Sequence, residues 1–327
     1  MSKKRILSGM RPTGKLHLGH LVGALNNWVK LQDEYQCFYM IADWHALMSE
    51  YEDPRNLKES CYEMVRDFVA SGLDPEKSVI FIQSHVPEHL ELAMVFSDIT
   101  PLAWVERVPT YKEQLREVKG RDLTTYGFLG YPVLQAADIA VYRANAVPVG
   151  VDQIPHLELT REIVRRFNGL YKEAIFPEPE AILTKTPKLL GLDNRKMSKS
   201  YANFIALSDT PEVIRKKVNV MITDAERVKL QDKGHPAICN VFSYYATFTK
   251  PENLAKVKDW CEGALKGCTE CKRGLADILI ETLEPIRQRR EKLSDSQVAD
   301  IIADGDKRAR KITVETMGEV RRVVNLL

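Results

Sequence analysis

The chain has 327 residues, a mass of 37.3 kDa and a net charge of +2 at pH 7. Apolar residues make up 44% and charged residues 28%, which argues against a largely disordered chain. No apolar run approaches the roughly 18 residues that a membrane-spanning helix needs. We therefore expect a cytoplasmic protein of about two domains that does not enter a membrane. In that compartment the six cysteines are predicted to be reduced thiols or metal ligands.

The first half of the chain alternates short apolar segments with helical patterns. The segments at residues 5–8, 37–41, 79–83 and 147–149 are typical of buried strands. Apolar residues recur at helical spacing over residues 18–29, 54–70 and 156–167. This alternation predicts an α/β fold with a Rossmann-type parallel sheet, whose ligands bind at the carboxyl ends of the strands.

The second half of the chain reads differently. Residues 176–180 form a proline-rich break, and a loop rich in Lys, Asn and Ser covers residues 191–201. Thr210 and Pro211 predict the start of a helix, and the chain beyond them is mostly helical in pattern. The predicted organisation is an α/β domain over residues 1–190, a loop over 191–205 and a C-terminal helical domain over 206–327.

A glycine-containing loop follows the first predicted strand. Residues 9–16 almost match the phosphate-binding pattern GxxxxGK[ST], but Leu16 stands where a hydroxyl would hold Mg²⁺. His17-Leu18-Gly19-His20 comes next, at the start of the first helix, with both histidines on one side. Two imidazoles at a helix N-terminus can donate hydrogen bonds to phosphate oxygens. The alternatives are two half-buried histidines or a metal-binding pair.

A second phosphate-handling candidate is Lys196-Met197-Ser198-Lys199-Ser200. Lysines three residues apart with interleaved hydroxyls suit a mobile clamp on a polyphosphate, although a solvated basic loop has the same composition. Together and in this order, HLGH and KMSKS resemble the two signature motifs of the class I aminoacyl-tRNA synthetases.

A candidate amino-acid pocket lies in the segment YPVLQAAD. Tyr131, Gln135 and Asp138 are spaced i, i+4 and i+7, so a helix with Pro132 in its first turn would present them on one side. They suit a small polar-aromatic ligand, and the carboxylate accepts an indole N–H or a phenol O–H equally well. The alternative is a helix face that points to solvent.

The resemblance becomes narrower at residues 147–153, 158–161, 7–9 and 42–45, which are similar to the tryptophanyl-tRNA synthetases, and it extends over essentially the whole chain. It implies that L-tryptophan is activated by ATP with Mg²⁺ and transferred to tRNA(Trp). The tyrosyl enzymes share the Tyr-x3-Gln-x2-Asp pattern, but Leu7 cannot bind a substrate hydroxyl as their tyrosine does. A further alternative is a non-catalytic synthetase paralogue that binds RNA.

The resemblance also implies a set of site residues. The tryptophan-binding residues would be Leu7, Gly9, Tyr131, Gln135, Asp138, Val147, Val149 and Gln153. The ATP-binding residues would be Arg11, Pro12, Thr13, Gly19, His20, Gly150, Val151, Asp152, Leu189, Lys196, Met197, Ser198, Lys199 and Ser200. The catalytic residues, which stabilise charge on the phosphates, would be His17, His20, Lys196 and Lys199.

Four of the six cysteines form a candidate metal site. Cys239, Cys261, Cys268 and Cys271 have the spacing C-x21-C-x6-C-x2-C. Four thiolates complete a tetrahedral Zn²⁺ site or hold an iron–sulfur cluster, and free thiols are the third possibility. A subgroup of tryptophanyl-tRNA synthetases has a similar spacing and binds [4Fe–4S], so we expect this cluster in preference to zinc.

The same resemblance gives the predicted domains their roles. Residues 1–190 would be the catalytic domain with a dimer-interface insertion, and residues 191–205 the KMSKS loop. Residues 206–327 would bind the anticodon, with the cysteine site bracing the helices. The family is homodimeric, and residues 101–111 are a candidate interface. Basic residues of a helix in this last domain are candidate tRNA contacts or a solvated face: Arg287, Arg289, Arg290 and Lys292.

Overall fold

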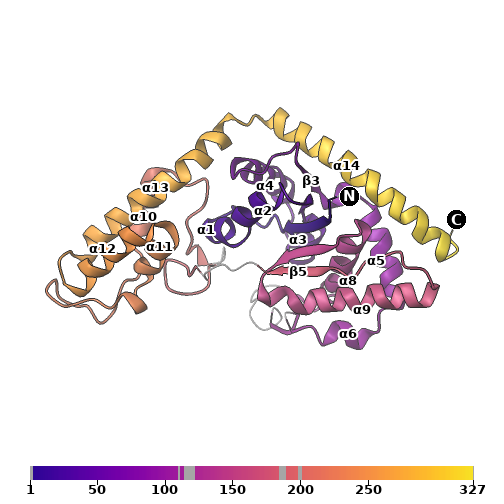
Figure 1. Ribbon diagram of the computed structural model, residues 1–327, viewed down its shortest axis with the longest axis horizontal. Coiled ribbons are helices and arrows are strands. Elements are labelled where there is room, and N and C mark those ends of the chain that lie inside the picture. The colour runs from indigo at the N-terminus through magenta and orange to yellow at the C-terminus, as the bar shows by residue number, and fades with distance from the viewer. Residues whose placement is uncertain (1–2, 110, 114–121, 184–188, 198–200, 327) are drawn as a thin grey trace. The chain divides into compact units, whose positions relative to one another are not determined.

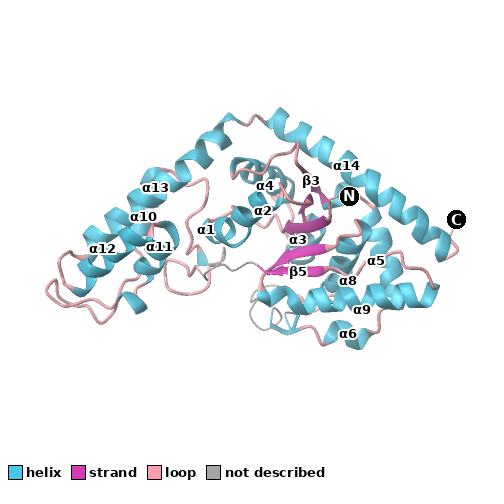
Figure 2. Ribbon diagram, in the orientation of Figure 1, coloured by secondary structure: helices cyan, strands magenta, loops and turns pink. Residues whose placement is uncertain are grey.

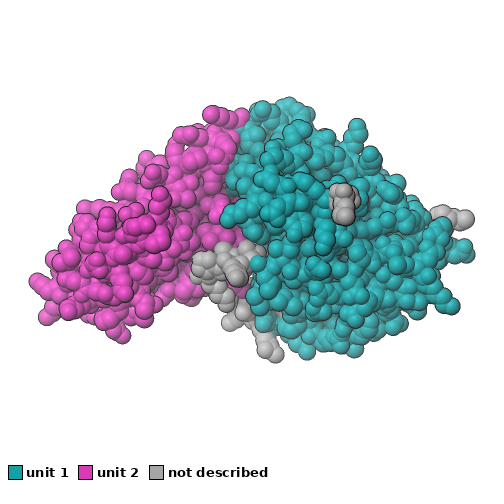
Figure 3. All heavy atoms as spheres, in the orientation of Figure 1, with its two compact units in different colours: residues 1–13, 27–184, 293–327 teal, residues 14–26, 185–292 magenta. Residues whose placement is uncertain are grey.

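The computed structural model describes residues 3–109, 111–113, 122–183, 189–197 and 201–326. The chain divides into two compact units (Figure 3). The first unit comprises Met1–Thr13, Asn27–Thr184 and Leu293–Leu327, and the second comprises Gly14–Asn26 and Lys185–Lys292. Among the described residues, no helix is both long and apolar enough to cross a membrane.

A five-stranded parallel sheet organises the first unit (Figure 2). Its strand order is β3-β2-β1-β4-β5, so the direction of winding reverses between β1 and β4. The strands are β1 (Arg5–Met10), β2 (Gln36–Ile41), β3 (Ser78–Ile82), β4 (Ala146–Val149) and β5 (Glu180–Leu183). The sequence prediction of a parallel α/β sheet is confirmed, and four strands fall where it placed them. It missed β5, because Glu180 was read as part of a proline-rich break.

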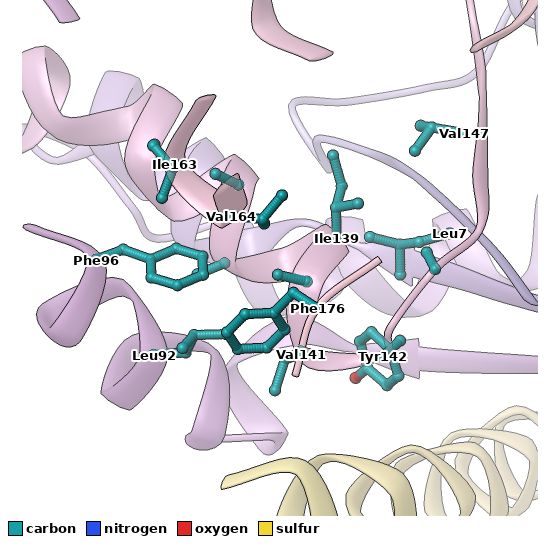
Figure 4. Close-up of a cluster of buried hydrophobic side chains, with 14 of the residues drawn as sticks. Leu7, Leu92, Phe96, Ile139, Val141, Tyr142, Val147, Ile163, Val164 and Phe176 are labelled. Carbon is teal, nitrogen blue, oxygen red and sulfur yellow. The ribbon is translucent and has the colours of Figure 1, made fainter. Parts of the chain in front are cut away.

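Helices surround this sheet (Figure 1). They are α2 (Asn26–Leu31), α3 (Asp43–Glu50), α4 (Leu57–Ala70), α5 (Glu88–Ile99), α6 (Leu102–Glu106), α8 (Tyr126–Val141), α9 (Ile154–Tyr171) and α14 (Asp295–Val323), with the single turns η2 (Gln83–His85) and η3 (Val151–Gln153). The main core of this unit joins β1 and β4 to α5, α8 and α9 (Figure 4).

Pro132 does not lie in the first turn of its helix, which corrects the sequence prediction. The helix α8 begins at Tyr126, because the Thr125 side chain accepts a hydrogen bond from Phe128 N and caps it. Pro132 therefore sits inside the helix, with Tyr131 and Asp138 buried on either side of it in the sequence. The missing N–H of Pro132 leaves one helical hydrogen bond unmade.

The last helix, α14, packs on the sheet of the first unit. A Cβ on Gly305 would lie 1.8 Å from the Ile80 carbonyl oxygen of β3, so only glycine allows this approach. Next to it, Asp306 accepts a hydrogen bond from Ile82 N and another from the His85 ring. The predicted helical domain of residues 206–327 therefore differs from the observed units, since α14 buries its apolar face against β3, α4 and α5.

The described part of the second unit consists of helices and loops. Its helical elements are α1 (Leu18–His20), η1 (Leu21–Leu25), α10 (Pro211–Asn219), η5 (Pro236–Ile238), α11 (Asn240–Phe248), α12 (Pro251–Glu262) and α13 (Cys268–Lys292). The predicted first helix is interrupted by a π-helical turn, η1, immediately after HLGH. Such turns are frequent at functional sites. The predicted start at Thr210-Pro211 is confirmed, with Thr210 as the cap.

Candidate active site

The predicted tryptophan-site residues lie on both strands of the topological switch, on the helix α8 and, for Gln153, in the turn η3. Leu7 and Gly9 are on β1, while Val147 and Val149 are on β4. A Cβ on Gly9 would lie 2.7 Å from the Met40 carbonyl oxygen of β2, so glycine is required there. Ligands of open parallel sheets bind at the carboxyl ends of strands beside such a switch.

Asp138 is the polar centre of this region. Its side chain is 1% exposed, and both of its oxygens have partners. His45 Nε2 lies 2.7 Å from Oδ2, while Gln83 Nε2 and His89 Nδ1 lie 2.8 and 2.6 Å from Oδ1. On its far side His89 contacts the Tyr142 hydroxyl at 2.9 Å. The result is a carboxylate fixed by side chains from α3, η2 and α5.

The neighbouring rings decide the charge of Asp138. Burial alone would raise its pKa, but the His45 and His89 imidazoles outweigh burial and bring the pKa down to about 2. At neutral pH the group is therefore a buried carboxylate. Among the described residues only His45 contacts its Oδ2, and a carboxylate oxygen accepts two hydrogen bonds, so Oδ2 can accept a further N–H from a ligand.

Tyr131 and Gln153 are the candidate ligands for a substrate ammonium group. The Tyr131 hydroxyl lies 3.3 Å from His156 Nε2. Burial, followed by the neighbouring His45, lowers the pKa of His156 to about 4, so its ring is neutral at pH 7. Gln153 Nε2 donates a hydrogen bond to Asp152 Oδ2 at 2.9 Å. The amide oxygen of Gln153 is then the atom that can accept a hydrogen bond from a ligand. Both side chains can thus present oxygen lone pairs to a cation.

The apolar side chains expected around an aromatic ligand are buried. Leu7, Val147 and Val149 are 3%, 5% and 9% exposed, and Leu7 and Val147 belong to the cluster of Figure 4 together with Ile139 of α8. Of the three predicted residues on α8, Tyr131 and Asp138 are buried and Gln135 is half-buried. The solvent-facing alternative for this helix face is therefore wrong.

The predicted nucleotide residues of the first unit follow β1 and β4. Arg11 is exposed, Pro12 is buried and Thr13 donates its N–H to the Arg11 carbonyl at 2.8 Å. A Cβ on Gly150 would lie 2.6 Å from Asp152 Oδ1, so the Asp152 side chain lies directly beside this glycine. Val151 and Asp152 are exposed in η3. The two strand ends therefore offer both charge and open backbone.

HLGH begins α1 in the second unit. His17 Nδ1 accepts a hydrogen bond from Gly19 N at 3.1 Å, and His20 Nδ1 accepts one from His17 N at 3.2 Å. A ring nitrogen that accepts is unprotonated, so each neutral ring carries its proton on Nε2. The two rings lie 3.8 Å apart, centroid to centroid. They form a pair of N–H donors, as an oxyanion or phosphate site requires.

The structure brings the start of KMSKS to HLGH within the second unit. Met197 Sδ lies 3.1 Å from the place that a Cβ on Gly19 would take. The His17 ring also packs on Phe204, with centroids 5.1 Å apart, and Leu18 N donates to the Ile205 carbonyl. Lys196 is exposed and Leu189 is half-buried. Ser198, Lys199 and Ser200 lie outside the described residues.

The four cysteines of the predicted metal site line one pocket. Cys239, Cys261, Cys268 and Cys271 share it with the cations Arg227 and Lys266. A Cβ on Gly234 would lie 2.4 Å from Cys261 Sγ, which shows how closely the chain wraps this site. Burial and the neighbouring thiols raise the pKa of Cys271 to about 12. The structure therefore gathers all four thiols at one pocket, as a shared metal site or a group of free thiols would.

Sequence reasoning missed His45, Gln83, His89 and His156. All four are polar side chains at or near the end of a strand or the start of the next helix, and His89 and His156 are fully buried. Their position after predicted strands was a signal. His45 and His89 lie 93 and 49 residues from Asp138 in the sequence. A local sequence pattern therefore could not predict that they pair with it.

Comparisons with known proteins agree with this geometry. Residues 2–284 match the family of tRNA synthetases class I (W and Y). The chain is 54% identical over 327 residues to the tryptophan–tRNA ligase of Thermotoga maritima, covering 99% of each chain. It is 44% identical to that of Aquifex aeolicus, covering 98% of this chain and all of the other.

Among solved structures, the tryptophanyl-tRNA synthetase of Campylobacter jejuni complexed with ADP and tryptophan superposes with a TM-score of 0.89. It is 32% identical, and the match covers 98% of this chain and all of that one. The full-length match therefore includes the parallel sheet, HLGH and the helical region that carries the cysteines. This chain belongs to the class I aminoacyl-tRNA synthetases, in the family that comprises the tryptophan and tyrosine enzymes.

Proposed function

We propose that this aminoacyl-tRNA synthetase is a tryptophan–tRNA ligase, which forms tryptophanyl-adenylate and pyrophosphate from L-tryptophan and ATP and then charges tRNA(Trp). The observation that carries the proposal is Asp138, a buried carboxylate held by two histidines and a glutamine. A buried carboxylate of this kind supports recognition of an indole N–H. The full-length identity to tryptophan–tRNA ligases supports the same substrate.

Tyrosine fits the same residues less well. The carboxylate of Asp138 would also accept a phenol O–H. Leu7, which is buried and apolar, offers no second polar contact to a hydroxyl. A site that hydrogen-bonds the polar atom of its substrate discriminates strongly, so this missing contact favours the indole.

The first reaction needs positioning and charge stabilisation. The tryptophan carboxylate oxygen attacks the α-phosphorus in line, forming the mixed anhydride as the bond to the pyrophosphate oxygen breaks. Tyr131 and Gln153 hold the α-ammonium, and Val147 and Val149 flank the ring. ATP is the second substrate, with Mg²⁺ on its phosphates as is typical of synthetases.

Charge on the phosphates is assigned to the two signature motifs. The Nε2–H groups of His17 and His20, together with Lys196 and Lys199, donate to phosphate oxygens as negative charge shifts to the leaving pyrophosphate. Arg11, Thr13 and Gly150 hold the remainder of the nucleotide. In the second reaction a ribose hydroxyl of the tRNA attacks the activated carbonyl, and AMP leaves.

We propose that the four-cysteine pocket holds a [4Fe–4S] cluster. Among the described residues, three or more possible ligand atoms lie within 4.8 Å of one another only at Asp224, Glu226 and His235. The sulfurs are thus spread more widely than those of one Zn²⁺, which lie about 3.8 Å apart when bonds are 2.3 Å and tetrahedral. Arg227 Nη1, 4.0 Å from Cys268 Sγ, adds a cation beside an anionic cluster.

The cluster would be structural, because aminoacylation involves no electron transfer. Cys239, Cys261, Cys268 and Cys271 would each supply one thiolate. Anaerobically purified protein should be brown and show the visible absorption of an iron–sulfur protein. The Cys271→Ser variant should lose this absorption. A colourless protein with one zinc per chain would contradict the cluster and favour the zinc alternative.

We further propose a cytoplasmic homodimer whose interface includes residues 101–111. Leu102 of α6 is 60% exposed, and Leu90 and Met94, one turn apart on the preceding helix α5, are 39% and 63% exposed. Exposed large apolar side chains are candidates for a protein interface. Sedimentation should give a dimer for the parent and a shift toward monomer for the Met94→Glu/Leu102→Glu variant.

The test of the proposed function is amino-acid-dependent pyrophosphate exchange. Tryptophan should support exchange and tyrosine should not, and Asp138→Ala should abolish the tryptophan signal. Exchange with tyrosine alone would identify a tyrosyl enzyme. Binding of tRNA without any amino-acid-dependent exchange would identify the non-catalytic alternative.

A further inference from the structure

A basic groove runs between two helices of the second unit. The helices α10 and α13 pack against each other, and Ile214 and Val218 of α10 and Leu275 of α13 are buried. Beside this contact their outer faces enclose a hollow of about 510 Å³. Its polar lining is Arg215, Lys216, Asn219, Thr269, Lys272 and Arg273.

The spacing of these residues explains why they line one groove. Thr269, Lys272 and Arg273 stand at i, i+3 and i+4 on the first turns of α13, which places them on one face. Arg215 and Asn219, at i and i+4, do the same on α10. The described lining holds four cations and no carboxylate.

The contacts that the groove's cations make within the chain leave them able to bind an anion. Lys272 Nζ donates to the Asn219 carbonyl at 2.9 Å and so links the two helices. Arg215 meets Asp277 at 2.6 Å, but both side chains are more than half exposed, and such pairs contribute little. Lys216 and Arg273 are exposed and form no ion pair with any carboxylate in the described part of the chain.

We propose that this groove binds the phosphate backbone of RNA. The inference rests on the proposed function, which makes tRNA the substrate, and names a place where the chain holds it. Guanidinium groups bind phosphate with two parallel hydrogen bonds, lysine adds a point charge, and the Asn219 and Thr269 side chains add neutral donors. The described residues that line the groove include no aromatic side chain on which a base could stack, which favours contact to phosphates.

The test is the salt dependence of tRNA binding by the full-length dimer. The double variant Lys216→Gln/Arg273→Gln removes two cations of the groove. The matched control, Lys250→Gln/Lys256→Gln, removes two exposed lysines. Lys250 is the N-cap residue of α12, and Lys256 lies within that helix. Each lost phosphate contact should make the slope of log K against log salt shallower by roughly 1. The groove variant should therefore lose roughly 2 from the slope and bind roughly 10- to 100-fold more weakly at 0.1 M salt.

The control should keep the parental slope, and both variants should keep the parental rate of tryptophan-dependent exchange, which needs no tRNA. An equal slope change in both variants, or in neither, would overturn the groove. So would loss of inorganic phosphate binding without any change in tRNA binding, because the site would then be one for small anions. A parent enzyme without tryptophan exchange would instead refute the proposed function.

Discussion

The surroundings of Asp138 and of HLGH are built in opposite ways. Asp138 is sealed in the first unit, and three side chains from separate elements fix its two oxygens. His17 and His20, in the second unit, are held by each other's backbone and by a three-residue helix, and His20 is only half-buried. The first arrangement is preorganised for a fixed ligand, and the second buries His17 but leaves the His20 ring partly exposed.

This difference matches the two tasks of the proposed reaction. Discrimination between amino acids requires a polar group that is held rigidly, so that it cannot move to accommodate a wrong substrate. Handling phosphates requires donors that follow charge as it moves and that admit and release a nucleotide. The variants below should separate the two regions, because each damages one of them.

The largest effect is expected at His20. His20→Ala should lower the rate of tryptophan-dependent exchange by about 10²–10³, as for the loss of one oxyanion donor, with little change in the KM for tryptophan. His20→Asn should restore much of the rate, because its amide can accept the His17 N–H and still donate. Exchange at the parental rate in His20→Ala would show that the ring does not touch the reacting phosphates.

A stability effect is expected at Gly305, which supports the Asp138 region through β3. Gly305→Ala would drive a Cβ into the Ile80 carbonyl and should cost roughly 3 kcal/mol of unfolding free energy. Gly318→Ala on the same helix has open space around it and should stabilise by about 0.5–1 kcal/mol. Urea denaturation measures both, and equal behaviour of the two variants would contradict the close packing of α14 on β3.

A smaller loss of stability is expected when the pH is lowered. The folded pKa of Asp138, about 2, lies below the ordinary value of 3.8, so its stabilisation is present above pH 4 and is lost as the pH falls toward 2. The loss amounts to about 2 kcal/mol. Urea denaturation between pH 5 and pH 2 should show this loss in the parent relative to Asp138→Asn. Parallel pH profiles would mean that the histidines do not depress the pKa.

The sequence predicted the sheet and the motifs better than it predicted their surroundings. Strand patterns and the spacing of HLGH are local, so they could be read directly. The return of α14 to the first unit depends on Gly305 meeting a strand more than 200 residues away, and no local pattern announces that contact. The partners of Asp138 were missed for the same reason, although each stands where a strand ends.

The central claim is that Asp138 accepts the indole N–H of tryptophan. Its most direct test is pyrophosphate exchange with tryptophan and with β-(3-benzothienyl)alanine, which keeps the shape of the bicyclic ring but lacks the N–H. The parent should favour tryptophan in kcat/KM by roughly 10² or more, since the analogue leaves one buried acceptor position of the carboxylate without its N–H, and Asp138→Asn should lose most of that preference. Equal use of the two amino acids by the parent would contradict the account.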